Sequence, residues 1–320
     1  MPDTRPTRRE LIAGGSLALC ASSALLGALR TELAAASMRQ RPWTVGAFAN
    51  PRAEQMTFAG AHQEVERLEA LIGHRLGIVS TFVAWEEPFP NPGHVFERDA
   101  GRRPLIAWYT DGDLARVSSG GADALLLRRA RACREFRAPI YLRWAAEFNG
   151  AHNPCYGRPR EFVAAWRRVV SVFRAAGAAN VRWVWCPLAL DRPRTAAENW
   201  RRYYPGDRFV DRVGMDGYNW GRTRAWSRWQ AFAEIFAPLY SDYARRRPMM
   251  ICEVGSAERG GAKAAWIRDM GAKLAGPFAG VRAVVWFDAR KETDWRVDSS
   301  AHALAAFRDL AQDPYFRVAG

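Results

Sequence analysis

The stretch PIYLRW at residues 139–144 predicts a short buried β-strand, because it is almost continuously aliphatic and aromatic. After a loop comes EFVAAWRRVVSVFRAA at residues 161–176, whose apolar residues recur with the period of an α-helix. VRWVWC at residues 181–186 then predicts a second strand. Two strands joined by a helix form the crossover unit of a parallel sheet, so this stretch indicates an α/β fold.

The same unit recurs along the chain. Strand-like segments occupy residues 44–48, 76–83, 104–109, 139–144, 181–186, 213–218, 249–253 and 281–287. Stretches with helical periodicity lie between them, among them residues 122–136, 161–176, 229–246 and 262–274. Eight such units close into a (β/α)8 TIM barrel, whose functional residues lie at the carboxyl ends of the strands. Because no change of composition marks a second domain, we expect residues 38–320 to form a single barrel domain.

The first 37 residues have the layout of a signal peptide. Arg8 and Arg9 precede an apolar stretch at residues 11–29, and small residues follow at 34–37. The paired arginines resemble a twin-arginine signal, which predicts export of the folded protein to the periplasm or the medium. An ordinary signal peptide and an uncleaved anchor are the alternatives. After residue 37 no apolar run is long enough to span a membrane, so we expect no stable membrane insertion of the mature protein.

The chain is strongly basic, with a formal net charge of +14, but only three of its 47 basic residues are lysine. The arginines are spread over every predicted helix, whereas a nucleic-acid-binding protein gathers its basic residues in one patch or tail. We therefore expect no nucleic-acid partner. The positive field predicts at most a weak association with anionic surfaces, and an ordinary solvated surface is the alternative.

The sequence indicates no cofactor. Cys133, Cys155, Cys186 and Cys252 remain after the leader, and neither a cysteine pair nor a histidine cluster has the spacing of a metal site. A glycine-rich phosphate loop and a Ca²⁺ loop are also absent from the sequence. Cys186 and Cys252 lie at predicted strand ends, where cysteine packs as a small apolar residue. Cys155 lies in a loop and is either paired or free.

Two glutamates follow predicted strands. Glu147 comes after the fourth segment, and Glu253 ends the seventh. Strand alternation groups Arg143 with Glu147 and Ile251 with Glu253, so we expect both glutamates to face the barrel mouth. Cleavage of a glycosidic bond requires one carboxylic acid to protonate the leaving oxygen and one carboxylate to attack or stabilise the anomeric carbon. The pair therefore predicts a glycoside hydrolase, and an ion pair with an arginine is the alternative for either glutamate alone.

Tryptophans near the same strand ends predict a sugar-binding cleft. A cleft for carbohydrate needs flat apolar faces that stack on pyranose rings. We expect Trp85, Trp108, Trp185 and Trp286 to supply these faces. Packing in the barrel core is the alternative for each of them.

Several motifs occur in a characteristic order. They are RWAAEFNG at residues 143–150, YPGD at 204–207, VGMDGYN at 213–219, ICEVGS at 251–256, VWFD at 285–288 and DWR at 294–296. Together they resemble glycoside hydrolase family 26, the family of β-mannanases and some mixed-linkage β-glucanases. The similarity extends over about residues 43–310, and linked motifs are more specific than any single one.

The resemblance implies a retaining double displacement. Glu253 would form a covalent glycosyl-enzyme, Glu147 would act first as acid and then as base, and Tyr218 would donate a hydrogen bond to Glu253. The two carboxyl groups of such an enzyme stand about 5–5.5 Å apart. We assign substrate-binding roles to further residues of the same motifs and strand ends, namely Arg143, Asn149, Asp216 and Tyr218.

One position departs from the family. Family 26 usually has a histidine immediately before the acid/base glutamate, whereas this chain has Ala146. The departure leaves the identity of the glycan open.

We expect an exported endo-acting β-glycanase whose partner is a β-glycan polysaccharide or oligosaccharide. Two alternatives use the same cleft: a catalytically silent carbohydrate-binding protein, and a transglycosylase that passes the glycosyl group to a sugar acceptor.

Overall fold

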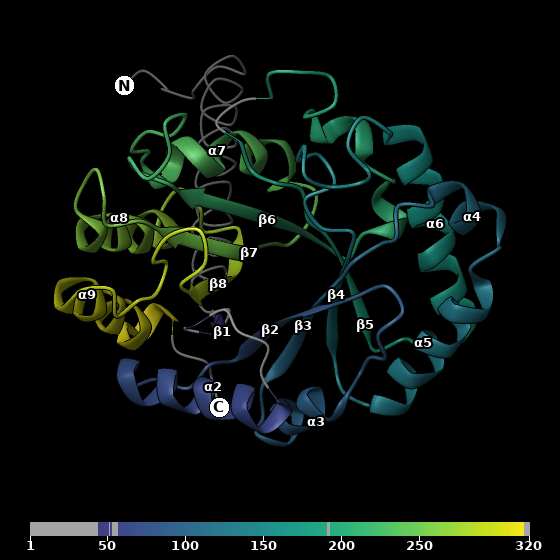
Figure 1. Ribbon diagram of the computed structural model, residues 1–320, viewed down its shortest axis with the longest axis horizontal. Helices are drawn as coiled ribbons and strands as arrows, with labels where there is room; N and C mark the ends of the chain where they lie inside the picture. The colour runs from purple at the N-terminus through teal and green to yellow at the C-terminus, as the bar shows by residue number, and fades with distance from the viewer. Residues whose placement is uncertain (1–43, 51, 53–56, 191–192, 317–320) are drawn as a thin grey trace, which may run out of the picture. The chain divides into compact units, whose positions relative to one another are not determined.

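The predicted (β/α)8 TIM barrel is confirmed. The computed structural model describes residues 44–50, 52, 57–190 and 193–316, so the predicted leader at residues 1–37 lies outside the described residues. Eight parallel strands close in sequence order, and β8 pairs with β1 (Figure 1). The strands are β1 (Thr44–Asn50), β2 (Ile78–Val83), β3 (Arg103–Trp108), β4 (Ile140–Trp144), β5 (Val181–Trp185), β6 (Arg212–Asn219), β7 (Met249–Ser256) and β8 (Val281–Ala289).

Helices surround the strands (Figure 1). They are α2 (Phe58–Ile72), α3 (Pro92–Asp99), α4 (Leu114–Ser119), α5 (Asp123–Phe136), α6 (Pro159–Ala175), α7 (Phe232–Tyr243), α8 (Lys263–Ala275) and α9 (Ala301–Gln312). The described part of the connection between β5 and β6 forms two short 3-10 helices, η1 (Trp200–Tyr203) and η2 (Asp207–Phe209).

Local capping explains where individual helices begin and end. The Thr57 hydroxyl accepts a hydrogen bond from the N–H of Gly60 and caps the start of α2. The same helix ends at Gly73, whose left-handed φ of 64° favours glycine. Helix α7 begins at Phe232, three residues later than predicted from periodicity, and Glu234 closes its first turn by accepting from the N–H of Ala231.

Apolar side chains fill the barrel below its mouth. One face of the strands contributes a buried inner cluster that consists of Ile78, Leu105, Tyr141, Val184, Cys186, Met250, Cys252, Ala283 and Val285. The opposite face of the strands packs with the helices in the main hydrophobic core, which we call the outer core. Because the interior is filled in this way, functional side chains have room at the carboxyl ends of the strands. The four described cysteines, including Cys155, are free and buried.

A register shift in β7 determines which of its side chains face the barrel mouth. Strand β6 pairs with β7 through Met215 and Ile251 and then through Asp216 and Glu253, so Cys252 is skipped. Ile251 packs in the outer core, whereas Cys252 belongs to the inner cluster. Regular alternation would turn Glu253 outward with Ile251, and the bulge turns it to the mouth instead. The prediction that Ile251 and Glu253 share one face is therefore wrong, although Glu253 does face the mouth.

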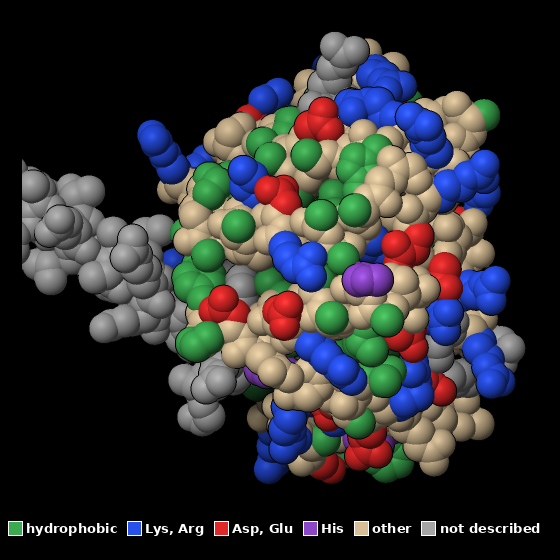
Figure 2. All heavy atoms as spheres, turned by 90° about the vertical axis from the view of Figure 1, so that its left-hand side faces the viewer, with side chains coloured by type: hydrophobic (Ala, Val, Ile, Leu, Met, Phe, Trp, Pro, Cys, Tyr) green, Lys and Arg blue, Asp and Glu red, His purple; other side chains and the backbone are tan. Residues whose placement is uncertain are grey.

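The surface of the barrel carries mixed charge. On the face shown in Figure 2, Lys and Arg side chains are interspersed with Asp and Glu side chains. Several arginines form ion pairs with acidic neighbours, as Arg168 does with Asp123 and Arg201 with Asp242. Within the described part of the chain, no helix combines the length and the apolar character needed to cross a membrane.

Candidate active site

A cleft of about 800 Å³ opens at the carboxyl ends of the strands. Its walls include both predicted glutamates, Glu147 after β4 and Glu253 on β7, and also Tyr218 on β6. Residues that end or follow the other strands complete the walls, such as Phe48 on β1 and Phe287 on β8. The barrel therefore brings residues that are far apart in the sequence into one site.

Glu253 is held by two donors from neighbouring strands. The guanidinium of Arg143 on β4 binds Oε1, and the hydroxyl of Tyr218 on β6 donates to Oε2 across 2.5 Å. The second contact is the hydrogen bond that the family resemblance implies. Burial raises the pKa of the Glu253 carboxyl; Arg143 opposes this rise, Glu147 adds to it, and Tyr218 opposes it. The two donors fix the carboxylate in one orientation at the base of the cleft.

A fully buried ion pair lies directly beneath Glu253. Arg143 donates from Nη1 to Oδ2 of Asp216 across 2.7 Å, and neither side chain is exposed to solvent. Burial opposes the charge of Arg143, but Asp216 and Glu253 outweigh it and raise the pKa of the guanidinium. Arg143 therefore stays charged and supports Glu253 from below.

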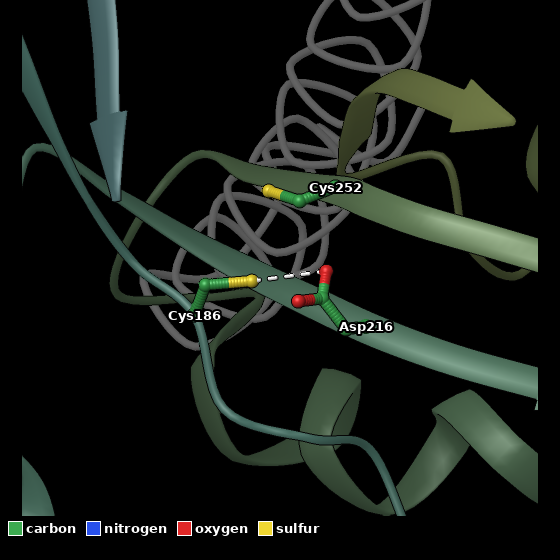
Figure 3. A group of neighbouring side chains, drawn as sticks. All are labelled: Cys186, Asp216 and Cys252. Carbon is green, nitrogen blue, oxygen red and sulfur yellow. Dashed lines mark hydrogen bonds between the residues drawn. The ribbon is translucent and has the colours of Figure 1, made fainter. Parts of the chain in front are cut away.

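Two thiols complete this buried layer. The Cys186 thiol points toward Asp216 and donates to its Oδ1 across 3.2 Å, and Cys252 on β7 lies close to both side chains (Figure 3). Gly214 leaves the space for both, because a Cβ there would lie 2.6 Å from Sγ of Cys186. Burial raises the pKa of the Cys186 thiol, which stays protonated.

The same three side chains have the spacing of a metal site. One ligand atom from each of Cys186, Asp216 and Cys252 lies within 4.8 Å of the others. However, Asp216 is already paired with the buried guanidinium of Arg143. A metal cation bound here would be repelled by that charge in an interior where charge is costly. We therefore assign these side chains to the support of Arg143.

Glu147 reaches the cleft through a backbone turn and not through strand alternation. Strand β4 ends at Trp144, and Ala145 and Glu147 then adopt left-handed φ values of 49° and 58°. The N–H of Glu147 donates to the carbonyl of Cys186 across 2.8 Å, which ties the turn to the end of β5. Strained non-glycine residues of this kind cluster at functional sites.

The turn places the two glutamates close together. One carboxylate oxygen of Glu147 lies within 4.8 Å of one oxygen of Glu253. Inverting glycosidases keep their carboxyl groups roughly 6.5–9.5 Å apart to admit a water molecule, whereas retaining enzymes keep them about 5–5.5 Å apart. The spacing in this cleft favours the retaining arrangement.

His152 is a cleft residue that was not predicted from the sequence. Its Nε2 lies 2.7 Å from Oε2 of Glu147. The hydrogen bond with Glu147 raises the pKa of the imidazole. An imidazole therefore lies beside Glu147 even though position 146 carries alanine. A single histidine in a loop is a weak sequence signal, and its position in the loop after the fourth strand was its one indication.

Arg143 and Asp216 do not line the cleft as predicted. Both are fully buried below Glu253, and their polar atoms bind one another and their neighbours. The prediction that they contact substrate is wrong, because neither side chain is exposed and neither is among the described residues that line the cleft. They position the carboxylate of Glu253 instead.

Asn149 also has a different role from the predicted one. Its side chain is buried, donates to the carbonyls of Leu188 and Glu198, and accepts from the N–H of Leu188. All of its bonds in the described structure therefore go to the backbone after β5. Asn149 anchors the turn that carries Glu147 and does not contact the cleft.

Two of the predicted tryptophan platforms belong to the outer core. Trp185 donates to the carbonyl of Tyr203 across 3.2 Å, and Trp286 packs against Phe307 of α9 with ring centroids 5.3 Å apart. Both are at most 1% exposed. Each occupies an outward strand position, next to an inward residue, so the prediction that they stack on sugar is wrong.

Trp85 and Trp108 form a second buried group. Trp85 stacks on Trp108 with ring centroids 4.7 Å apart, and Phe89 covers the same indole edge-on at 4.9 Å. Trp108 borders the cleft, but its side chain is fully buried. Neither indole presents an open face to a ligand, so the platform prediction is wrong for this pair as well.

Other aromatic side chains form the cleft wall. Phe48, Phe82 and Phe287 pack together at the barrel mouth, where the Phe48 centroid lies 5.0 Å from each of the other two. These phenylalanines occupy inward positions near the ends of β1, β2 and β8. The alternation of residues along each strand shows which positions share a face, but it identifies the inward face only once the register is known.

A group of tryptophans outside the strands extends the same wall. Trp295 packs on Tyr218 and on Trp220, with ring centroids 4.9 Å apart in both pairs. Trp226 lies 5.3 Å from Trp220 and is 71% exposed, and Tyr109 on the cleft wall is 52% exposed. These open aromatic faces suit sugar rings.

Comparison with known proteins places the chain among glycoside hydrolases. A sequence profile of glycosyl hydrolase family 26 matches residues 126–312. Endoglucanase H of Acetivibrio thermocellus is 35% identical over 259 residues, which cover 77% of this chain and 28% of that protein. A β-1,3-xylanase of a Vibrio species is 30% identical over 136 residues, which cover 39% of this chain and 28% of that protein. The matched region thus spans little more than a quarter of each of these curated relatives.

Solved structures share the barrel. A β-mannanase from a symbiotic protist of the termite Reticulitermes speratus, solved with a gluco-manno-oligosaccharide, superposes with a TM-score of 0.62 at 16% identity over 88% of this chain and 90% of that one. A family 26 β-mannanase from Bacteroides ovatus gives a TM-score of 0.61 at 14% identity over 88% and 92% of the two chains. These structures support the fold. Because the family profile covers more than half of the sequence, the chain belongs to glycosyl hydrolase family 26.

Proposed function

We propose that this protein is a retaining β-glycanase that cleaves glycosidic bonds by double displacement, with Glu253 as nucleophile and Glu147 as acid/base. The observation that carries the proposal is the pair of carboxylates in one cleft, with an oxygen of each within 4.8 Å of the other. Membership of family 26 supports glycoside hydrolysis. The two donors to Glu253, buried Arg143 and Tyr218 on the cleft wall, support its role as the residue that attacks.

In the first step, an oxygen of Glu253 attacks the anomeric carbon while protonated Glu147 gives its proton to the glycosidic oxygen. The glycosidic bond breaks, the leaving sugar departs with that proton, and an ester forms between the sugar and Glu253. Arg143 and Tyr218 hold the attacking carboxylate in one orientation, so the carboxylate needs little reorientation before it attacks.

In the second step, Glu147 is a carboxylate and takes a proton from a water molecule. The oxygen of that water attacks the anomeric carbon and releases Glu253 as a carboxylate. The charge of Arg143 and the hydroxyl of Tyr218 stabilise the carboxylate as it leaves. Each step inverts the configuration of the anomeric carbon once, so the product keeps the configuration of the substrate.

The substrate that we propose is an internal bond of a β-linked polysaccharide. The exposed faces of Trp226 and Tyr109 lie on the wall of an open cleft and can stack on pyranose rings. The relatives named above include an endoglucanase, a β-1,3-xylanase and β-mannanases. Transfer to a sugar acceptor uses the same glycosyl-enzyme and would appear as products longer than the substrate.

We also propose that the protein acts outside the cytoplasm. The leader at residues 1–37, with Arg8 and Arg9 before its apolar stretch, supports export. Cell fractionation tests this proposal. We expect the parent chain in the exported fraction and the Arg8→Lys, Arg9→Lys double variant in the cytoplasm. Equal export of both would exclude the twin-arginine route.

The mechanism is tested by assays on purified protein. Mannan, mixed-linkage β-glucan, cellulose, xylan and an acidic exopolysaccharide are incubated with the enzyme, and reducing ends are measured. NMR then follows the anomer of the first product, and we expect the β-anomer. Glu253→Gln and Glu147→Gln should each lower kcat by about three orders of magnitude or more on a cleaved glycan.

Glu292→Gln is the matched control, because Glu292 lines the same cleft but binds the indole of Trp295. It should retain most of the activity. An initial α-product would exclude double displacement. Calorimetric binding of a glycan with no release of reducing ends would instead favour the silent carbohydrate-binding protein.

A further inference from the structure

His152 contacts Glu147 in a way that the double displacement does not itself require. Its Nε2 lies 2.7 Å from Oε2 of Glu147, and its side chain is 63% exposed. Both residues belong to one tight turn, in which the N–H of Gly150 donates to the carbonyl of Glu147 across 2.8 Å. The side-chain amide of Asn153 donates from Nδ2 to the carbonyl of Ala146 across 2.7 Å and closes the turn. The imidazole is therefore folded back onto the carboxylate by local structure.

Gly150 makes this close approach feasible. A Cβ at position 150 would lie 2.7 Å from Cε1 and 3.0 Å from Nδ1 of His152. The ring thus lies directly against a backbone that carries no side chain. Any larger residue at position 150 would push the imidazole away from Glu147.

We propose that His152 is a positioning residue for Glu147. His152 orients the carboxyl group through Oε2 and shares a proton with it. It thereby supplies the cleft with an imidazole, although position 146 carries alanine. The inference rests on the proposed acid/base role of Glu147. With Oε2 bound to Nε2–H, the other oxygen of Glu147 is left to exchange its proton with the glycosidic oxygen or with water.

The surroundings of the pair favour a shared proton. Other titratable side chains that face it come from four parts of the barrel: Tyr109 after β3, Asp216 and Tyr218 on β6, Glu253 on β7 and Lys291 after β8. The hydrogen bond with Glu147 raises the pKa of His152, and the charges of Glu147 and Glu253 act in the same direction. Burial and Lys291 act against it.

Proton sharing has a consequence for the pH dependence. When the pair holds one proton, imidazolium beside carboxylate and imidazole beside carboxylic acid are two forms with the same proton count. The acid form of Glu147 then remains available until the pair loses its last proton, near the raised pKa of the imidazole. Without His152, the carboxyl group of Glu147 has no imidazole with which to share that proton.

The pH profile of kcat/KM on a cleaved oligosaccharide tests the proposal with the full chain. We expect His152→Asn to move the basic limb to lower pH by about one unit or more, because asparagine does not titrate in this range. Gly150→Ala should move it in the same direction, since it keeps the imidazole but displaces it. His302→Asn, at an exposed position on α9, is the control and should leave the profile unchanged.

A measurement independent of activity separates the two proposals. NMR titration of the His152 ring should show its pKa falling in Glu147→Gln. An unchanged pKa in that variant, or an unshifted basic limb in both His152→Asn and Gly150→Ala, would overturn the role of His152. A lower kcat with an unshifted limb would show that the ring only packs. By contrast, full activity of Glu147→Gln would refute the acid/base assignment while leaving the ring titration interpretable.

Discussion

The hydroxyl of Tyr218 donates to Oε2 of Glu253 across 2.5 Å. The two residues lie on adjacent strands, β6 and β7, and the bond exists because the bulge in β7 turns Glu253 toward the barrel mouth. Among the described residues, the Glu253 carboxylate is bound by Tyr218 and by Arg143. Both donors can therefore influence attack and departure of the carboxylate.

Tyr218→Phe should lower kcat by about 10- to 100-fold, because one preorganised donor to the departing carboxylate is lost. KM should change little, since the ring remains in the aromatic wall. Tyr109→Phe is the matched control: it removes another cleft hydroxyl that does not bind Glu253, and should have a smaller effect. Steady-state kinetics on one glycan compares the three proteins, and equal rates for Tyr218→Phe and the parent would exclude this role.

Arg143→Met should destabilise the barrel by about 3–5 kcal/mol, because it leaves Asp216 and Glu253 buried without their partner. Denaturant unfolding measures the change in the free energy of unfolding. Arg201→Met removes a surface ion pair with Asp242 and should cost about 1 kcal/mol or less. Equal costs for the two variants would contradict the buried ion pair beneath Glu253.

Trp226→Ala should raise KM for a long glycan with little effect on stability, because this indole is 71% exposed on the cleft wall. Trp286→Ala should do the reverse and destabilise the fold by about 3–5 kcal/mol, because its side chain is buried under α9. Glycan binding and thermal unfolding of both variants check the contrast. A change in KM for Trp286→Ala, in protein that remains folded, would speak against its place in the core.

His94 should make stability depend on pH between about 4 and 6.5. Its buried ring accepts from the N–H of Asn91 and contacts the Thr81 hydroxyl, and burial lowers its pKa to about 4. Below pH 6.5 the unfolded chain binds a proton that the native ring does not, so the free energy of unfolding falls as the pH falls, by roughly 3 kcal/mol in total.

Denaturant unfolding at pH 7 and pH 4.5 tests this dependence. His94→Gln should reduce the loss of stability between the two pH values, whereas the exposed His302→Gln should not. Asp288 acts in the opposite direction, because burial raises its pKa to about 6 and its native carboxyl takes up a proton as the pH falls. The comparison therefore uses the difference between each variant and the parent. An identical pH dependence in His94→Gln would refute the prediction.

The sequence by itself determined the barrel and the two glutamates at its mouth. Strand and helix periods are local properties, so residues 139–186 already indicate one parallel unit, and eight units of this kind close in one way. The carboxyl ends of parallel strands lie at one rim. Glu147 and Glu253 could therefore be assigned to the same cleft before their distance was known.

Only the tertiary structure decided which side chains reach that cleft. The inward face of a strand depends on register, and a single skipped residue in β7 reverses it for Glu253. The same dependence explains why Trp185 and Trp286 lie in the outer core although they occupy strand ends. The contact of His152 with Glu147 depends on a left-handed turn and on the space at Gly150. Hydrophobic periodicity reports whether a residue is apolar, but it does not report backbone turns or bulges, and in this protein those features place the polar groups of the site.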